Sequence, residues 1–150
     1  MFDSVVFLGK KNIMLIRFCI IFIVLLLTIK FAFAKIVDVN NEQIIELSKT
    51  NIQIVDVRRS SEWDQTGVVP ESILLTFFDK KGNYNFDEWY EELRLKIDEG
   101  KPIILICRTG RRTTIIAKMM NKKFDNVIYN AKNGITSWID EKLITVKPQY

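Results

Sequence analysis

The pattern of apolar and polar positions changes character at residue 35. After this point, short apolar runs rich in β-branched residues predict buried strands. The strands are expected at residues 52–57, 72–77, 103–107 and 126–129, and a further short apolar run lies at 35–39. Apolar residues three and four positions apart predict amphipathic helices between the runs. The helices are expected after Asn40 or Asn41, after Ser60 or Ser61, and at residues 86–97, 113–121 and 134–139.

This alternation predicts the fold class. Strands without polar alternation are buried on both faces, which is typical of parallel sheets. Amphipathic helices between them predict an α/β fold with a small open parallel sheet and helices on both faces. No repeat or low-complexity stretch divides residues 35–150, so we expect one domain there.

Residues 1–34 follow the pattern of a secretory signal peptide. No charged residue lies between Phe18 and Ile29, basic residues precede this run, and Ala32 and Ala34 are the small residues that a signal peptidase requires. We therefore expect cleavage after Ala34 and export, most simply to a bacterial periplasm. The alternative is an uncleaved membrane anchor, for which the apolar run is short: twelve helical residues cover about 18 Å, against a hydrocarbon core of about 30 Å.

Removing this leader changes the charge balance. The whole chain has 22 basic and 18 acidic residues and a net charge of +4. Four of the basic residues and one of the acidic residues lie in the leader, so residues 35–150 carry a net charge of +1. The basic surplus is therefore no argument for a nucleic-acid partner, and membrane association is expected only if the leader is retained.

The remaining domain has one cysteine, Cys107, and the chain has no histidine. This composition excludes a disulfide framework, a Cys/His zinc site, a Ser-His-Asp triad and a Cys-His dyad within residues 35–150. Because exported proteins enter an oxidising compartment, we expect a single free thiol there to have a chemical role.

Cys107 ends a predicted strand, at the sheet edge where open α/β folds bind ligands. The loop and the first residue of the next predicted helix are Cys107, Arg108, Thr109, Gly110, Arg111, Arg112 and Thr113. A short loop curled around the sulfur would direct backbone amides and a helix N-terminus toward it, favouring thiolate over thiol without a histidine. Gly110 would permit close backbone approach, and Thr113 would aim its hydroxyl into this anion cradle.

The arginines strengthen the case for a functional site. The chain has fifteen lysines and seven arginines, yet three of the arginines lie within residues 108–112. Arginine offers a planar fork of donors that suits oxyanions. The other interpretation is a solvated basic turn beside an inert buried cysteine. The strand-end position, the lone thiol and the clustered arginines together favour a functional site.

Two charged residues close to the end of another strand complete the candidate site. Asp56 and Arg58 are expected to form an ion pair that supports the loop or an adjacent turn, in preference to acting on substrate. Arg112, the last loop residue, is a candidate for the same supporting role. Glu62 is expected to belong to the first-turn cap of the following helix.

These segments resemble the rhodanese family. The loop at 107–113 is similar to the family's active-site loop, and residues 54–58 followed by Glu62-Trp63 are similar to its first signature. Residues 67–70 occupy the place of its Gly-His-Ile-Pro turn, and residues 133–138 resemble its C-terminal motif. The chain departs from the family at Val68, Glu71, Ser72 and Asn133. An exported single-domain form is similar to the phage-shock-protein-E type.

The resemblance implies a sulfurtransferase that needs no cofactor. The Cys107 thiolate would take the sulfane sulfur of a donor such as thiosulfate, Arg108 or Arg111 would stabilise the leaving sulfite, and a thiol or cyanide would accept the sulfur from the persulfide. Two alternatives remain open: a non-catalytic persulfide carrier for a protein partner, and an oxyanion enzyme of the phosphatase or arsenate-reductase kind. Such phosphatases have arginine six residues after the cysteine, where this chain has Thr113.

Overall fold

The computed structural model describes residues 35–150 except 99, 122 and 125. Its centre is a five-stranded sheet in the order β1-β5-β4-β2-β3, in which all neighbouring strands are parallel. The strands are β1 (Ile36–Val39), β2 (Gln53–Asp56), β3 (Ile73–Leu74), β4 (Ile103–Ile106) and β5 (Ile128–Ala131). The predicted parallel α/β fold is confirmed, and the apolar run at 35–39 forms the edge strand β1.

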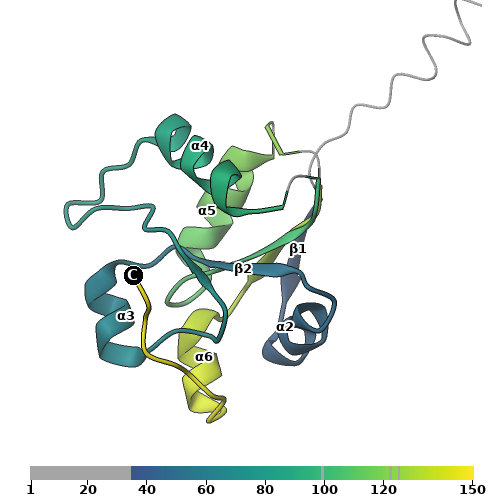
Figure 1. Ribbon diagram of the computed structural model, residues 1–150, viewed down its shortest axis with the longest axis vertical. Coiled ribbons are helices and arrows are strands. Elements are labelled where there is room, and N and C mark those ends of the chain that lie inside the picture. The colour runs from purple at the N-terminus through teal and green to yellow at the C-terminus, as the bar shows by residue number, and fades with distance from the viewer. Residues whose placement is uncertain (1–34, 99, 122, 125) are drawn as a thin grey trace, which may run out of the picture. The chain divides into compact units, whose positions relative to one another are not determined.

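Helices cover both faces of this sheet (Figure 1). They are α2 (Asn41–Ser48), α3 (Ser60–Thr66), α4 (Phe86–Lys96), α5 (Arg111–Met120) and α6 (Gly134–Asp140). Strand β4 is buried throughout, and its successive side chains enter different cores. Ile103 and Leu105 pack in the core that contains residues of α4 and α5, whereas Ile104 and Ile106 pack in the core that contains residues of α2 and α6. Cys107 packs in the same core as Ile103 and Leu105, which contains residues of α5.

Three predicted elements differ from the structure by two residues or more at an end. Strand β3 is two residues long, not six; after it, only single hydrogen bonds from the Leu75 and Phe77 amides, to the Asp56 and Val57 carbonyls, continue along β2. Strand β5 runs two residues further than predicted, to Ala131, because polar Asn130 stays in the sheet by donating to Asp38 (2.7 Å) and Thr114 (3.1 Å). Helix α5 begins at Arg111, two residues before the predicted start, because Gly110 caps it.

The C-terminal segment packs back on the helix that carries Glu62. Val146 forms an antiparallel bridge with Val68, and the Tyr150 hydroxyl donates to Asp64 of α3 at 2.8 Å. No helix in the described part of the chain is both long and apolar enough to cross a membrane. The predicted leader, residues 1–34, lies outside the described residues.

Candidate active site

Cys107 follows β4 at the carboxyl edge of the sheet and is buried, with 1% of its surface exposed. Its Sγ lies 3.6 Å from Oγ1 of Thr113, which is fully buried in the first turn of α5. The Thr113 hydroxyl also donates to the Gly110 carbonyl at 2.8 Å. Because a hydroxyl has one proton, it can serve either this carbonyl or an ionised sulfur.

Gly110 turns the loop into α5. It adopts a left-handed conformation with φ of +80° and caps the helix, so that the helix starts at Arg111. A Cβ atom at this position would lie 2.0 Å from the Lys132 carbonyl oxygen, which no side chain permits. The early start brings the N-terminal amides of α5 next to Cys107. No hydrogen-bond acceptor within the described residues meets the backbone amides of residues 108–113, which are therefore available to an anion.

Helix α6 holds the other side of the loop. The amides of Ile135 and Thr136 donate to the carbonyls of Cys107 (2.8 Å) and Arg108 (3.1 Å), and the Thr136 hydroxyl donates to the Arg108 carbonyl at 2.8 Å. A Cβ atom on Gly134 would lie 2.4 Å from this backbone, so the contact is tight. In a trans peptide the carbonyl and the next amide point in opposite directions. The amides of residues 108 and 109 therefore point away from α6.

Arg112 is bound by Glu62 of α3. Its Nη1 donates to Oε2 at 2.8 Å and its Nη2 to Oε1 at 2.6 Å. Burial raises the pKa of Glu62, but hydrogen bonds from Arg112 and from the Arg59 amide lower this pKa to about 2. The hydrogen bond to Glu62 raises the pKa of Arg112, and Cys107 adds to this effect. Arg112 directly precedes Thr113, whose Oγ1 lies 3.6 Å from the sulfur.

Arg108, Thr109 and Arg111 are exposed at the rim of the loop. In the part of the chain that the structure describes, neither of these two arginines forms an ion pair. Arg108 borders a cavity of about 160 Å³ between α3 and α6. The other lining residues are Arg58, Glu62, Gln65, Thr66, Ile135, Thr136, Ile139 and Asp140.

Asp56 and Arg58 form a buried ion pair behind α3. The Arg58 guanidinium donates to the Asp56 carboxylate at 2.7 and 3.0 Å, and both residues are at most 1% exposed. The same guanidinium donates to Thr66 Oγ1 (2.7 Å) and to the Gly67 carbonyl (2.8 Å), which fixes the end of α3. The pair therefore positions the helix that carries Glu62, and it does not contact Cys107.

Sequence reasoning missed the second partner of Glu62. This residue does cap α3, because its Oε2 accepts from the Arg59 amide at 3.2 Å. It also binds a guanidinium fifty positions away. The capping position gave a local signal for the first role, but no local pattern indicates the second.

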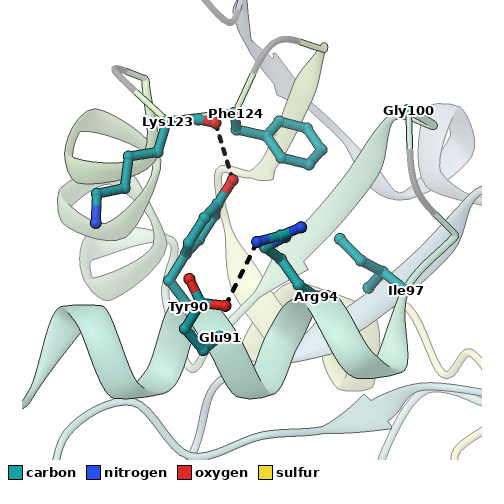
Figure 2. A pocket seen from close by; sticks show the side chains of 7 residues that line it. All are labelled: Tyr90, Glu91, Arg94, Ile97, Gly100, Lys123 and Phe124. Atoms are coloured by element: carbon teal, nitrogen blue, oxygen red, sulfur yellow. Dashed lines mark hydrogen bonds and ion pairs between the residues drawn. The ribbon is translucent and has the colours of Figure 1, made fainter.

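A larger cavity, of about 470 Å³, lies at the other edge of the sheet, where α4 faces the segment after α5 (Figure 2). Its polar contacts are internal to the protein: the Tyr90 hydroxyl donates to the Lys123 carbonyl at 2.9 Å, and Arg94 pairs with Glu91 at 3.4 Å. It contains no thiol and is remote from the candidate loop. Among the described residues, no three Cys, Asp or Glu side chains cluster as metal ligands would.

Together, the parallel sheet and the cysteine loop define an α/β domain with a buried free cysteine at the carboxyl edge of its sheet, next to loop amides that have no acceptor among the described residues. The model of the rhodanese-like domain matches residues 37–141, and this chain belongs to that family, which includes sulfurtransferases. The rhodanese domain-containing protein CG4456 of Drosophila melanogaster is 32% identical over 82 residues, which are 52% of this chain and 74% of the relative.

Solved structures share the fold. Rv0390 from M. tuberculosis is 28% identical with a TM-score of 0.59, and the match covers 67% of this chain and 80% of that protein. The polysulfide-sulfur transferase homodimer from Wolinella succinogenes is 18% identical with a TM-score of 0.56, covering 77% and 81% of the two chains. At this identity the second match shows the fold alone.

Proposed function

We propose that the protein is a sulfurtransferase that carries sulfane sulfur on Cys107, with thiosulfate or a similar anion as donor. The observation that carries the proposal is the setting of the sulfur: a buried thiol that contacts Thr113 in the first turn of α5, in a loop with unpaired backbone amides and two exposed arginines. The family supports the same chemistry, because it generally uses sulfur-containing donors and thiol acceptors. One relative in fold is named a polysulfide-sulfur transferase.

The reaction has two displacement steps. The Cys107 thiolate attacks the outer sulfur of thiosulfate, a new S–S bond forms, and the old S–S bond breaks with its electron pair leaving on sulfite. Arg108 and Arg111 stabilise the charge on the departing sulfite, while the loop amides hold the persulfide. A thiolate or cyanide then attacks the outer sulfur of the persulfide and regenerates the Cys107 thiolate.

The arrangement favours sulfur transfer over phosphate chemistry. A phosphatase of the cysteine type needs a guanidinium that can grip the phosphoryl oxygens. Arg112 already directs two of its donors to Glu62, and the next position is Thr113. One solved structure with this fold is titled a possible tyrosine phosphatase, but at 20% identity it informs on the fold alone.

The test is to incubate residues 35–150 with thiosulfate, measure the intact mass, add cyanide and assay thiocyanate. We expect a gain of one sulfur atom on Cys107 and its loss to cyanide. A protein that gains no sulfur is not a sulfurtransferase for this donor. A protein that gains sulfur but does not turn over is a persulfide carrier, the second candidate.

We also propose that the chain is exported, as a single-domain enzyme of the phage-shock-protein-E type. The support is the order of basic, apolar and small residues in 1–34. Expression of the full chain in bacteria, followed by fractionation and N-terminal sequencing, tests this. A periplasmic protein that begins at Lys35 is expected, and a membrane-bound full-length chain would identify an anchor instead.

A further inference from the structure

The bidentate contact between Glu62 and Arg112 connects α3 to the second residue of α5. We propose that Glu62 is a positioning residue for the sulfur: its carboxylate holds the Arg112 guanidinium against Cys107 and leaves the donor anion to Arg108 and Arg111. This inference rests on the proposed function of the loop.

The geometry of the contact carries the inference. Both carboxylate oxygens of Glu62 accept, at 2.8 and 2.6 Å, and the two side chains are 15% and 22% exposed. A bidentate fork fixes the plane of the guanidinium as well as its distance. A guanidinium has five N–H groups, so the donors that do not bind Glu62 remain for the sulfur.

The carboxylate is itself held in place. Glu62 Oε2 accepts from both the amide and the Nε of Arg59, each at 3.2 Å. The helix beneath it is fixed by Arg58, which donates to the Glu62 carbonyl at 3.3 Å and to the end of α3. A continuous set of contacts therefore runs from β2 through α3 to Arg112, the residue before Thr113, whose hydroxyl lies 3.6 Å from the sulfur.

The pairing also divides the charges of the site. Glu62 compensates the charge of Arg112, so Arg112 adds little to the field that attracts an anion from solvent. Of the three loop arginines, Arg108 and Arg111 have no carboxylate partner among the described residues and are exposed at the rim. Loss of Glu62 should therefore affect the reactivity of the sulfur, whereas loss of a rim arginine should affect donor binding.

The experiment compares Glu62→Gln with Glu62→Asp and with Glu91→Gln. The last is a matched control, because Glu91 pairs with Arg94 in an exposed contact on α4 (Figure 2), and neither residue belongs to the loop or to α3. Four quantities are measured: the rate of Cys107 alkylation by iodoacetamide, kcat, KM for thiosulfate, and unfolding in urea. Alkylation reports on the sulfur without any sulfur donor.

We expect Glu62→Gln to slow alkylation and to lower kcat, each by about tenfold, the effect of one lost charge-assisted hydrogen bond. KM for thiosulfate should change by less than about twofold, since the rim arginines are intact. Glu62→Asp, which keeps the carboxylate, should recover part of both rates. Glu91→Gln should match the wild type in all four measurements.

Two results would overturn the inference: wild-type alkylation in Glu62→Gln, or a raised KM with unchanged kcat. If wild-type protein takes no sulfur from thiosulfate, the proposed function fails, but the alkylation series still decides the role of Glu62. If Glu62→Gln does not fold, the exchange Glu62→Arg with Arg112→Glu is used, because it restores an ion pair but removes the guanidinium from the sulfur. Restored folding with slow alkylation supports positioning, and restored alkylation refutes it.

Discussion

The contact between Gly110 and Lys132 makes Gly110→Ala the sharpest test of the loop geometry. The added Cβ would lie 2.0 Å from the Lys132 carbonyl oxygen, whereas ordinary contacts begin at 3.4 Å. The loop must therefore move by more than an ångström. In addition, alanine must adopt φ of +80°, a conformation that costs an L-residue about 1–2 kcal/mol.

The chain offers a control that separates these two costs. Gly82 has φ of +87° in an exposed turn, and no atom lies within 4 Å of its added Cβ. Gly82→Ala should therefore cost only the backbone strain, about 1–2 kcal/mol. Gly110→Ala adds an overpacking cost of about 1–3 kcal/mol, for a total of roughly 2–5 kcal/mol.

Urea unfolding and the rate of sulfur loading from thiosulfate measure the outcome. A displacement of 1 Å in a catalytic group can slow a reaction by about a hundredfold, so we expect Gly110→Ala to lose loading by about that factor. Gly82→Ala should load at the wild-type rate. Equal losses of unfolding free energy in the two variants would show that the contact with Lys132 does not constrain the loop.

Four further predictions concern charge and the nucleophile. Cys107→Ser should gain no sulfur from thiosulfate, and residual thiocyanate formation would identify a different nucleophile. Arg111→Ala should raise KM for thiosulfate by about tenfold, through loss of one charge-assisted contact, with unchanged unfolding; an unchanged KM counts against its role. Asp56→Asn should destabilise the domain by about 3–5 kcal/mol in urea, because Arg58 becomes an uncompensated buried charge, and a loss below 1 kcal/mol would contradict this. The pKa of Glu62 is lowered in the folded state, so its contribution to stability is complete above pH 4.5 and is lost as the pH falls toward 2. Glu62→Gln should remove this component from the pH dependence of unfolding, whereas an identical profile would show that the ion pair is not formed in solution.

Features that depend only on neighbouring positions in the sequence were predicted correctly. The run at 103–106 is apolar on both faces, which predicts burial in the middle of a parallel sheet. Cys107 directly follows this run, so the predicted end of the strand also predicts that the thiol lies at the carboxyl edge of the sheet. The structure shows both features, because they depend on chain order and periodicity alone.

Features that depend on distant partners were not predictable in this way. The hydrogen bonds of Asn130 to Asp38 and Thr114 keep a polar residue within β5, and neither partner is close in sequence. The early start of α5 depends on the position of Lys132, which excludes any side chain at residue 110.

The two contacts of Glu62 differ in whether the sequence could predict them. Its place in the first turn of the predicted helix indicates a cap, and the cap is present, although the N-cap residue is Arg59 and not the predicted Ser60 or Ser61. Its contact with Arg112 requires that α3 and α5 meet at the carboxyl edge of the sheet, which chain order does not specify.

The three loop arginines therefore have unequal roles, although they look equivalent in the sequence. Arg112 is compensated by Glu62 and directly precedes Thr113, which contacts the sulfur, so we infer a role for Arg112 at the sulfur. Arg108 and Arg111 are exposed and have no carboxylate partner in the described chain, so in the proposed reaction they supply the field that a dianionic donor meets first. Since the chain has no histidine, we expect the thiol to be activated by loop amides, the α5 terminus and the guanidinium that Glu62 holds. A lysine at position 112 could supply the charge, but it has no planar fork through which Glu62 could fix its orientation.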